Sequence, residues 1–324
     1  MKIQYSKLNF CLNQEDLNKI KQIIESGWVC SGKWVEKLEQ YFKNRFNVRY
    51  AIACANATSG LISSVHALSQ IEDRKLLFSM PAFTWYSTKY AVENCKIKFH
   101  DIDPETFLLD TSDVEDFYKS DYIINVDIFG NNSRLYNCNI PTIYDAAHGF
   151  GLKDLGNRGL IEVVSLSFTK IISGMQGGMV LTNSMTHYNL IKELISNYAK
   201  LTEVNAYMAL KSIDNFEFNQ SARLKCIKFY RENIKIPFCE QKITSDTNYS
   251  VYGIILESPT IRNKIIRSLD KNEIEYKIYY EPVSEVPFLN TMYIYNRIIC
   301  LPVYEELLYD GRLDFICKII NEAL

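Results

Sequence analysis

A lysine with a setting suited to covalent chemistry stands in the stretch SLSFTKIISGMQGG, at Lys170. It follows an apolar run typical of a strand and precedes two bends that contain glycine or small residues. A lysine that forms a Schiff base needs an amine that an aldehyde can reach and that is sheltered enough for its pKa to fall. For any single lysine, a solvated and idle amine is the ordinary alternative. The strand-end position beside apolar residues favours the reactive amine.

A carboxylate and a histidine follow another strand-like run, in TIYDAAHGFG. A carboxylate at Asp145 could keep the pyridine nitrogen of a cofactor protonated, so that the ring accepts electrons more readily. The alternative is an aspartate that caps a helix or turn. His148 could contact the phenolic oxygen of the same cofactor, or it could be a packed or capped histidine.

Two further stretches, ACANATSGL and PAFTWYST, offer binding groups. Ala57, Thr58 and Ser59 stand at an apparent helix start, where free N–H groups and the positive end of the helix dipole suit a phosphate. Many helices begin this way without binding anything. Trp85 could stack on a flat cofactor ring, or it could fill core space.

An alternation of short β-rich runs with helical stretches, from about residue 50, supplies the scaffold for these residues. It predicts an α/β fold with a largely parallel sheet. The carboxyl ends of the strands carry the active sites of such sheets, so the segments just after them are the candidates. The predicted strands are RYAIAC, KLLFS, KIKFH, YIINVDIF, TIYD, VVSLSF and GGMVLTN, and TSGLISSVHAL and TWYSTKYAVENC are predicted helices.

Longer helical stretches follow from about Asn183. A strand candidate, YSVYGIIL, and two helices, SPTIRNKIIRSLDK and LDFICKIINEAL, then suggest a smaller α+β domain. We predict a large cofactor-binding domain over residues 1–215 and a small C-terminal domain over residues 216–324.

The composition is that of a soluble globular protein, with 47% hydrophobic and 23% charged residues in 324. The net charge of −2 provides no global field for nucleic acid or an anionic membrane, so a small-molecule partner fits better. No apolar run has the length of a signal peptide or a membrane span, which predicts a cytoplasmic protein. Nine scattered cysteines without a CxxC pair indicate reduced structural thiols, with no disulfide framework and no metal site.

The four chemical stretches occur in an order that resembles the DegT/StrS-type sugar aminotransferases, a fold type I group of pyridoxal-5′-phosphate enzymes. The resemblance begins with IIESGWVCSGKWVEKLEQYF, passes through VDIFGNN and ends with YYEPV and ICLPVYEEL. It implies a mostly parallel central sheet flanked by helices, plus a smaller C-terminal α+β domain.

The resemblance also implies roles for single residues. Lys170 would hold the cofactor, Asp145 would partner its ring nitrogen and Trp85 would stack on the ring. Thr58 with Ser165 would hold the phosphate. The chain departs from the family pattern at three residues: an acidic residue is usual at Gln176, a histidine is frequent at Asp127, and an asparagine that reaches the neighbouring subunit's phosphate is expected at Tyr198. The segment between Lys170 and YYEPV, whose loops help to shape the substrate pocket, is also short.

The implied function is transfer of an amino group from an amino acid, L-glutamate by analogy, to a nucleotide-linked keto-deoxysugar for surface glycan or O-antigen biosynthesis. A 4-keto sugar is preferred over a 3-keto sugar because TWYST and DAAH resemble members that act there. A homodimer with shared active sites is implied as well. Alternatives are a sugar dehydratase of the same family, in which histidine replaces the lysine, and a non-catalytic or regulatory paralogue. A nicotinamide-dependent enzyme would need a GxGxxG after a strand, which the sequence lacks.

Overall fold

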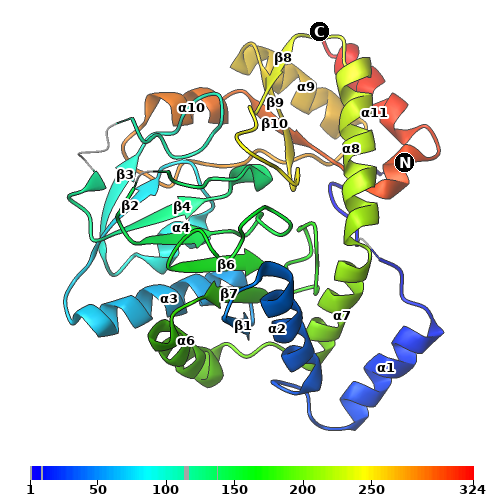
Figure 1. Ribbon diagram of the computed structural model, residues 1–324. Helices are drawn as coiled ribbons and strands as arrows, with labels where there is room; N and C mark the ends of the chain where they lie inside the picture. The colour runs from blue at the N-terminus through cyan, green and yellow to red at the C-terminus, as the bar shows by residue number, and fades with distance from the viewer. Residues whose placement is uncertain (1, 9, 113–116, 137) are drawn as a thin grey trace.

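A seven-stranded sheet lies at the centre of the larger part of the molecule (Figure 1). The computed structural model describes residues 2–8, 10–112, 117–136 and 138–324. The strand order is β1-β7-β6-β5-β4-β2-β3, in which β7 is antiparallel to both neighbours and the other pairs are parallel. The predicted α/β fold with a largely parallel sheet is confirmed. Its strands are β1 (Tyr50–Cys54), β2 (Leu77–Pro81), β3 (Lys96–His100), β4 (Tyr122–Val126), β5 (Thr142–Asp145), β6 (Ile161–Ser165) and β7 (Gly178–Thr182).

Helices cover both faces of this sheet, which is why its central strands read as continuous apolar runs. Alternate residues of one strand enter different cores: Val163 packs in the cluster beneath α3 (Ala57–Glu72) and α6 (Met185–Tyr198), while Val164 packs in the cluster beneath α2 (Lys33–Phe46) and α7 (Glu203–Asp214). The sheet is thereby fixed from both sides, and its carboxyl-terminal edge remains the accessible part.

Side-chain caps define where most of these helices begin. The Asn56 side chain accepts the Ser59 N–H at the start of α3, and the Ser59 hydroxyl completes a capping box. Helix α1 (Gln14–Glu25) starts with a similar box, formed by Asn13 and Asp16. Ser184 and Thr202 cap α6 and α7 by accepting the backbone N–H of His187 and of Asn205.

Several predicted elements end earlier than expected, and two of them lie beside the chemical stretches. The helix expected over residues 84–95 is α4, which spans only Tyr86–Ala91, because the chain turns at Val92 to enter β3. The strand expected over residues 163–168 is β6, which ends at Ser165, opposite Gly178 of β7. Lys170 therefore stands in the connection after β6.

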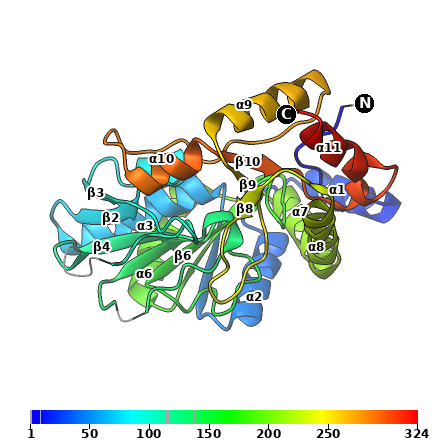
Figure 2. The same ribbon diagram turned by 90° about the horizontal axis from the view of Figure 1, so that it is seen from above.

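A three-stranded antiparallel sheet forms the smaller part of the molecule and lies beside the large sheet (Figure 2). Its core unites Ile254, Leu301 and Ile316 with Ile3 from the other end of the chain. The predicted strand and two helices are confirmed as β9, α9 and α11. A boundary after residue 215 stays a prediction. The elements are α8 (Phe216–Asn233), β8 (Phe238–Glu240), β9 (Tyr252–Leu256), α9 (Pro259–Lys271), α10 (Leu289–Tyr295), β10 (Ile298–Leu301) and α11 (Arg312–Asn321).

Within the described ranges, no helix combines the length and the apolar character that crossing a membrane requires.

Candidate active site

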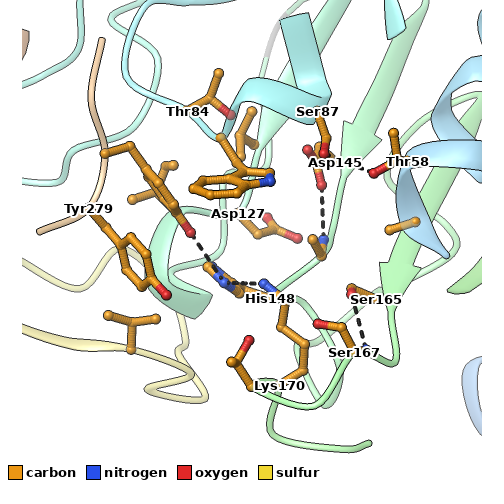
Figure 3. A pocket seen from close by; sticks show the side chains of 18 of the residues that line it. Thr58, Thr84, Ser87, Asp127, Asp145, His148, Ser165, Ser167, Lys170 and Tyr279 are labelled. Carbon is orange, nitrogen blue, oxygen red and sulfur yellow. Dashed lines mark hydrogen bonds between the residues drawn. The ribbon is translucent and has the colours of Figure 1, made fainter. Parts of the chain in front are cut away.

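A cavity of about 550 Å³ opens where the parallel strands end (Figure 3). The segments after β2, β4, β5 and β6 line it, together with the start of α3. The smaller part of the molecule and the N-terminal segment complete its wall. The residues that line it and carry the argument below are Tyr5, Ala57, Thr58, Trp85, Asp127, Asp145, His148, Ser165, Lys170, Gln176, Tyr279 and Tyr280.

Lys170 and His148 point towards one another inside this cavity (Figure 3). The Lys170 Nζ lies 2.7 Å from His148 Nε2. Burial lowers the pKa of Lys170 from 10.5 to about 8, and it also lowers the pKa of His148 well below its ordinary value. The imidazole is therefore neutral, and its Nε2 accepts a hydrogen bond from the amine when the ring proton is on Nδ1. Near neutral pH, Lys170 has a far larger fraction of free amine than a surface lysine.

Asp145 ends β5 and is buried on the cavity wall. Its carboxylate accepts hydrogen bonds from the Thr88 hydroxyl at 2.7 Å and the Ala147 N–H at 3.1 Å. Burial raises the pKa of Asp145 above its ordinary value, although these two donors and the Lys170 charge oppose the rise. No salt bridge joins Asp145 to a basic side chain of the described residues, so a protonated ring nitrogen would fit here as a partner.

The start of α3 lies on the side of the cavity opposite Tyr279 (Figure 3). Ala57 and Thr58 are its first two residues, so their N–H groups have no acceptor within the helix. Thr58 Oγ1 donates to Ser87 Oγ at 2.8 Å, and Ser165 lines the same region. Gly178 lets β7 pass close to this turn, because a Cβ there would stand 2.7 Å from the Ala57 nitrogen.

Aromatic side chains form the wall on the other side. The Trp85 ring lies 5.8 Å from the Tyr280 ring, and Tyr279 stacks on Tyr280 at 4.7 Å. The Tyr5 ring meets Tyr279 edge-on at 6.1 Å. Trp85 is 56% exposed, which leaves its face open to a bound molecule instead of core packing.

The sequence-predicted residues can be compared with this arrangement one by one. The structure brings Ala57, Thr58, Trp85, Asp145, His148, Ser165 and Lys170 to one cavity. Ser59 does not line it; its hydroxyl is hydrogen-bonded to Asn56 in the helix cap. This cap is the physical reason why Ser59 faces away from the cavity.

Several residues of the site were not singled out from the sequence. Thr88 holds Asp145, and its own hydroxyl lies 2.9 Å from that of Thr84. The spacing of four residues between these threonines in PAFTWYST is the signal that could have shown them. Tyr280 lies in YYEPV, and its hydroxyl is 3.4 Å from His148 Nε2. Nothing in the local sequence marks Tyr5.

The departures at Gln176 and Tyr198 occupy different places. Gln176 lines the cavity, and its backbone carbonyl accepts a hydrogen bond from Asn205 at 2.9 Å. Tyr198 is 54% exposed outside the cavity, where its hydroxyl lies 2.7 Å from that of Ser63.

Asp127 is the other carboxylate on the cavity wall, but its oxygens are already occupied. Arg158 donates to both of them, at 2.9 and 2.8 Å, and Ser133 donates its N–H and hydroxyl to Oδ1. Arg158 also pairs with Glu162, and all three charged side chains of this Asp127–Arg158–Glu162 cluster are fully buried. Asp127 therefore supports the wall and is not a free proton acceptor.

The donor set as a whole fits pyridoxal phosphate. A sheltered amine suits the aldehyde, a buried carboxylate suits the ring nitrogen, an open aromatic face suits the flat ring, and a helix start suits the phosphate. These four groups converge on one cavity of suitable size.

Comparison with known proteins agrees with this geometry. The model of the DegT/DnrJ/EryC1/StrS aminotransferase family matches residues 10–320. The chain is 27% identical to the dTDP-4-amino-4,6-dideoxy-D-glucose transaminase of Shigella dysenteriae over 90% of each chain, and 24% identical to the GDP-perosamine synthase of Escherichia coli over 96% of each. Helicobacter pylori PseC, an aminotransferase involved in the biosynthesis of pseudoaminic acid, has the same fold, with a TM-score of 0.88 and 18% identity over 100% of this chain and 99% of that one. The sugar-aminotransferase resemblance and the fold that it implied are confirmed: the chain belongs to the DegT/DnrJ/EryC1/StrS aminotransferase family.

Proposed function

We propose that this protein is a pyridoxal-phosphate-dependent aminotransferase that moves an amino group from an amino acid to a nucleotide-linked keto-deoxysugar. The observation that carries the proposal is the amine of Lys170, which burial brings to a pKa of about 8 inside the cavity that also holds Asp145. A lysine with this pKa is suited both to hold an aldehyde and to move a proton near neutral pH.

When bound, the cofactor supplies a ring that accepts electrons from the amino donor. Asp145 holds a proton at the ring nitrogen, and Thr88 fixes that carboxylate. Lys170 removes the proton from the α-carbon of the donor, oriented by its hydrogen bond to the neutral His148. Ala57, Thr58 and Ser165 would hold the phosphate, and the half-exposed face of Trp85 would be free to stack on the ring.

For the substrates, we propose L-glutamate as the donor and a 4-keto sugar, in preference to a 3-keto sugar, as the acceptor. Support for the 4-keto acceptor comes from the Shigella dysenteriae relative, whose name places the amino group at carbon 4 of a dTDP-linked sugar. Support for glutamate is family analogy alone. A cytoplasmic location and a role in surface glycan or O-antigen synthesis are proposed on the same ground.

Lys170 also separates this proposal from its rivals. Dehydratases of the family carry histidine at the position of this lysine, so the amine favours transamination. A non-catalytic paralogue would have no need for Lys170, Asp145 and the open face of Trp85 in one cavity. It is supported by the departures at Gln176 and Tyr198 and by the short segment between Lys170 and YYEPV.

The test is the absorbance of the protein loaded with pyridoxal phosphate, before and after addition of L-glutamate. We expect a visible band from the lysine-bound cofactor, which glutamate converts to the near-ultraviolet band of the amine form. Lys170→Ala should lose both the visible band and sugar amination, because no other amine takes its place.

The matched control is Lys153→Ala, which removes an exposed lysine that does not line the cavity and should leave the spectrum unchanged. Normal transamination by Lys170→Ala would overturn the assignment. If glutamate leaves the visible band unaltered, the assignment of the cofactor stands and the assignment of glutamate as the donor is wrong.

A further inference from the structure

Resting on the proposed role of Lys170, we propose that Asn248 is a positioning residue: its amide holds the loop that carries His148, so that the smaller part of the molecule fixes the hydrogen bond between His148 and Lys170. Asn248 belongs to the segment that joins β8 to β9. It does not line the cavity, and the proposal assigns it no contact with substrate or cofactor.

Every hydrogen-bonding group of the Asn248 side chain has a partner. Nδ2 donates to the backbone carbonyls of His148 and Phe150, the latter at 2.9 Å, and Oδ1 accepts the Ser250 N–H at 2.8 Å. Because two of these partners are carbonyls and the third is an N–H, only one orientation of the amide satisfies them all. With 2% exposure, Asn248 has no access to water as a substitute partner.

The site is built to admit this side chain. Gly130 follows β4, and a Cβ on it would stand 1.9 Å from Asn248 Oδ1. Its φ of +88° also favours glycine. The Asn248 backbone N–H donates to the Gly130 carbonyl at 3.1 Å. Asn248 therefore connects the segments that follow β4 and β5, both of which line the cavity.

The contacts converge on His148 from two directions. Asn248 holds its carbonyl, while Tyr280 lies against its ring, at 6.4 Å between ring centres and 17° between planes. The Tyr280 hydroxyl lies 3.4 Å from the same Nε2 that is 2.7 Å from Lys170 Nζ. Both residues come from the smaller part of the molecule. A shift of that part would therefore move the imidazole and change the environment of the Lys170 amine.

Asn248→Asp tests the inference with nearly unchanged side-chain volume. The substitution replaces the donating amide nitrogen by an oxygen, which faces the His148 and Phe150 carbonyls without donating to them. The matched control is Gln241→Glu. Gln241 lies in the same segment and also donates to two carbonyls of the larger part, those of Thr106 at 2.7 Å and Ile128 at 3.2 Å, but neither is in the His148 loop.

The first measurement is the pH titration of the visible band in protein loaded with pyridoxal phosphate. We expect Asn248→Asp to move the midpoint by about half a pH unit or more, and to lower kcat by roughly tenfold with a smaller change in KM. Gln241→Glu should keep the wild-type midpoint. If Asn248→Asp titrates like the wild type, the inference is wrong.

A second measurement needs neither cofactor nor substrate, and so separates this inference from the proposed function. The chain has four histidines, whose ring signals can be followed by NMR and assigned with a His148→Gln variant. In Asn248→Asp, the pKa of His148 read from this signal should rise towards its ordinary value, because water gains access to a loop that the amide no longer holds. If Asn248→Asp fails to fold, Asn248→Ser should show the same change to a lesser degree, and an unaltered His148 signal in that variant would overturn the inference.

Discussion

The pKa of Lys170 determines at which pH the protein can capture its cofactor. Burial lowers this pKa to about 8, while the charge of Asp145 acts in the opposite direction. Since only the free amine attacks an aldehyde, capture should accelerate as pH rises through 8 and then level off. With an ordinary lysine, the rate of capture would keep rising until the pH approached that lysine's pKa of 10.5. The measurement is the rate at which the visible band appears when pyridoxal phosphate is added to the apoprotein between about pH 6 and pH 10.

Asp145→Asn provides the check on this prediction. The substitution removes the charge that raises the pKa of Lys170, so the midpoint of the capture rate should fall below that of the wild type. A wild-type midpoint near 10.5 would contradict the sheltered amine.

At the residue scale, the sequence predicts the site residues whose position depends on the strand or helix next to them in the chain. Lys170, Asp145 and Thr58 follow strands or begin a helix, and parallel strands bring such positions to one edge. Contacts between distant segments leave no local pattern. The Asn248 amide is 100 residues from His148 in the chain, so only the folded structure shows it as a partner.

At the scale of elements, the Asp127–Arg158–Glu162 cluster joins the end of β4 to β6. Arg158→Met should destabilise the protein by about 3 to 5 kcal/mol, because it leaves two buried carboxylates without their cation. The measurement is the free energy of unfolding in denaturant, with activity followed in parallel.

Arg74→Met is the matched control for that prediction. Arg74 also forms a bidentate pair with an aspartate, Asp121, but its side chain is 50% exposed. Water screens this pair, so Arg74→Met should lower the free energy of unfolding by less than about 1 kcal/mol. Equal losses in the two variants would show that burial of the Arg158 cluster has no particular importance for stability.

Element types follow from the sequence more securely than element ends. Six of the seven strands are mostly apolar runs, β3 alternates polar and apolar residues, and all seven were predicted. The ends of β6 and α4 depend on the structure of the segments that follow them. β6 ends at Ser165 because its partner β7 begins at Gly178, and Gly177, with a φ of +149°, turns the chain there.

At the scale of the whole molecule, exposed apolar side chains lie just before α2 and at the end of α6. Trp28 is 66% exposed, Val29 48% and Tyr198 54%. Their segments are joined by backbone hydrogen bonds, from the Glu203 N–H to the Val29 carbonyl and from the Ala55 N–H to the Ala199 carbonyl, both 2.8 Å. Large exposed aromatic residues of this kind are typical of protein interfaces. A second copy of the chain is the partner that the family resemblance implies.

We therefore expect Trp28→Asp to convert a homodimer into monomers, because a charge at the centre of an apolar interface costs several kcal/mol in association. Light scattering after size exclusion gives the mass of each species, and the sugar-amination rate should fall together with the dimer fraction if the active sites are shared. Leu289→Asp is the control: Leu289 is 83% exposed but begins α10, on the opposite side of the molecule from α2 (Figure 1). An active wild-type monomer, or a Trp28→Asp variant that remains dimeric, would place the interface elsewhere or remove it.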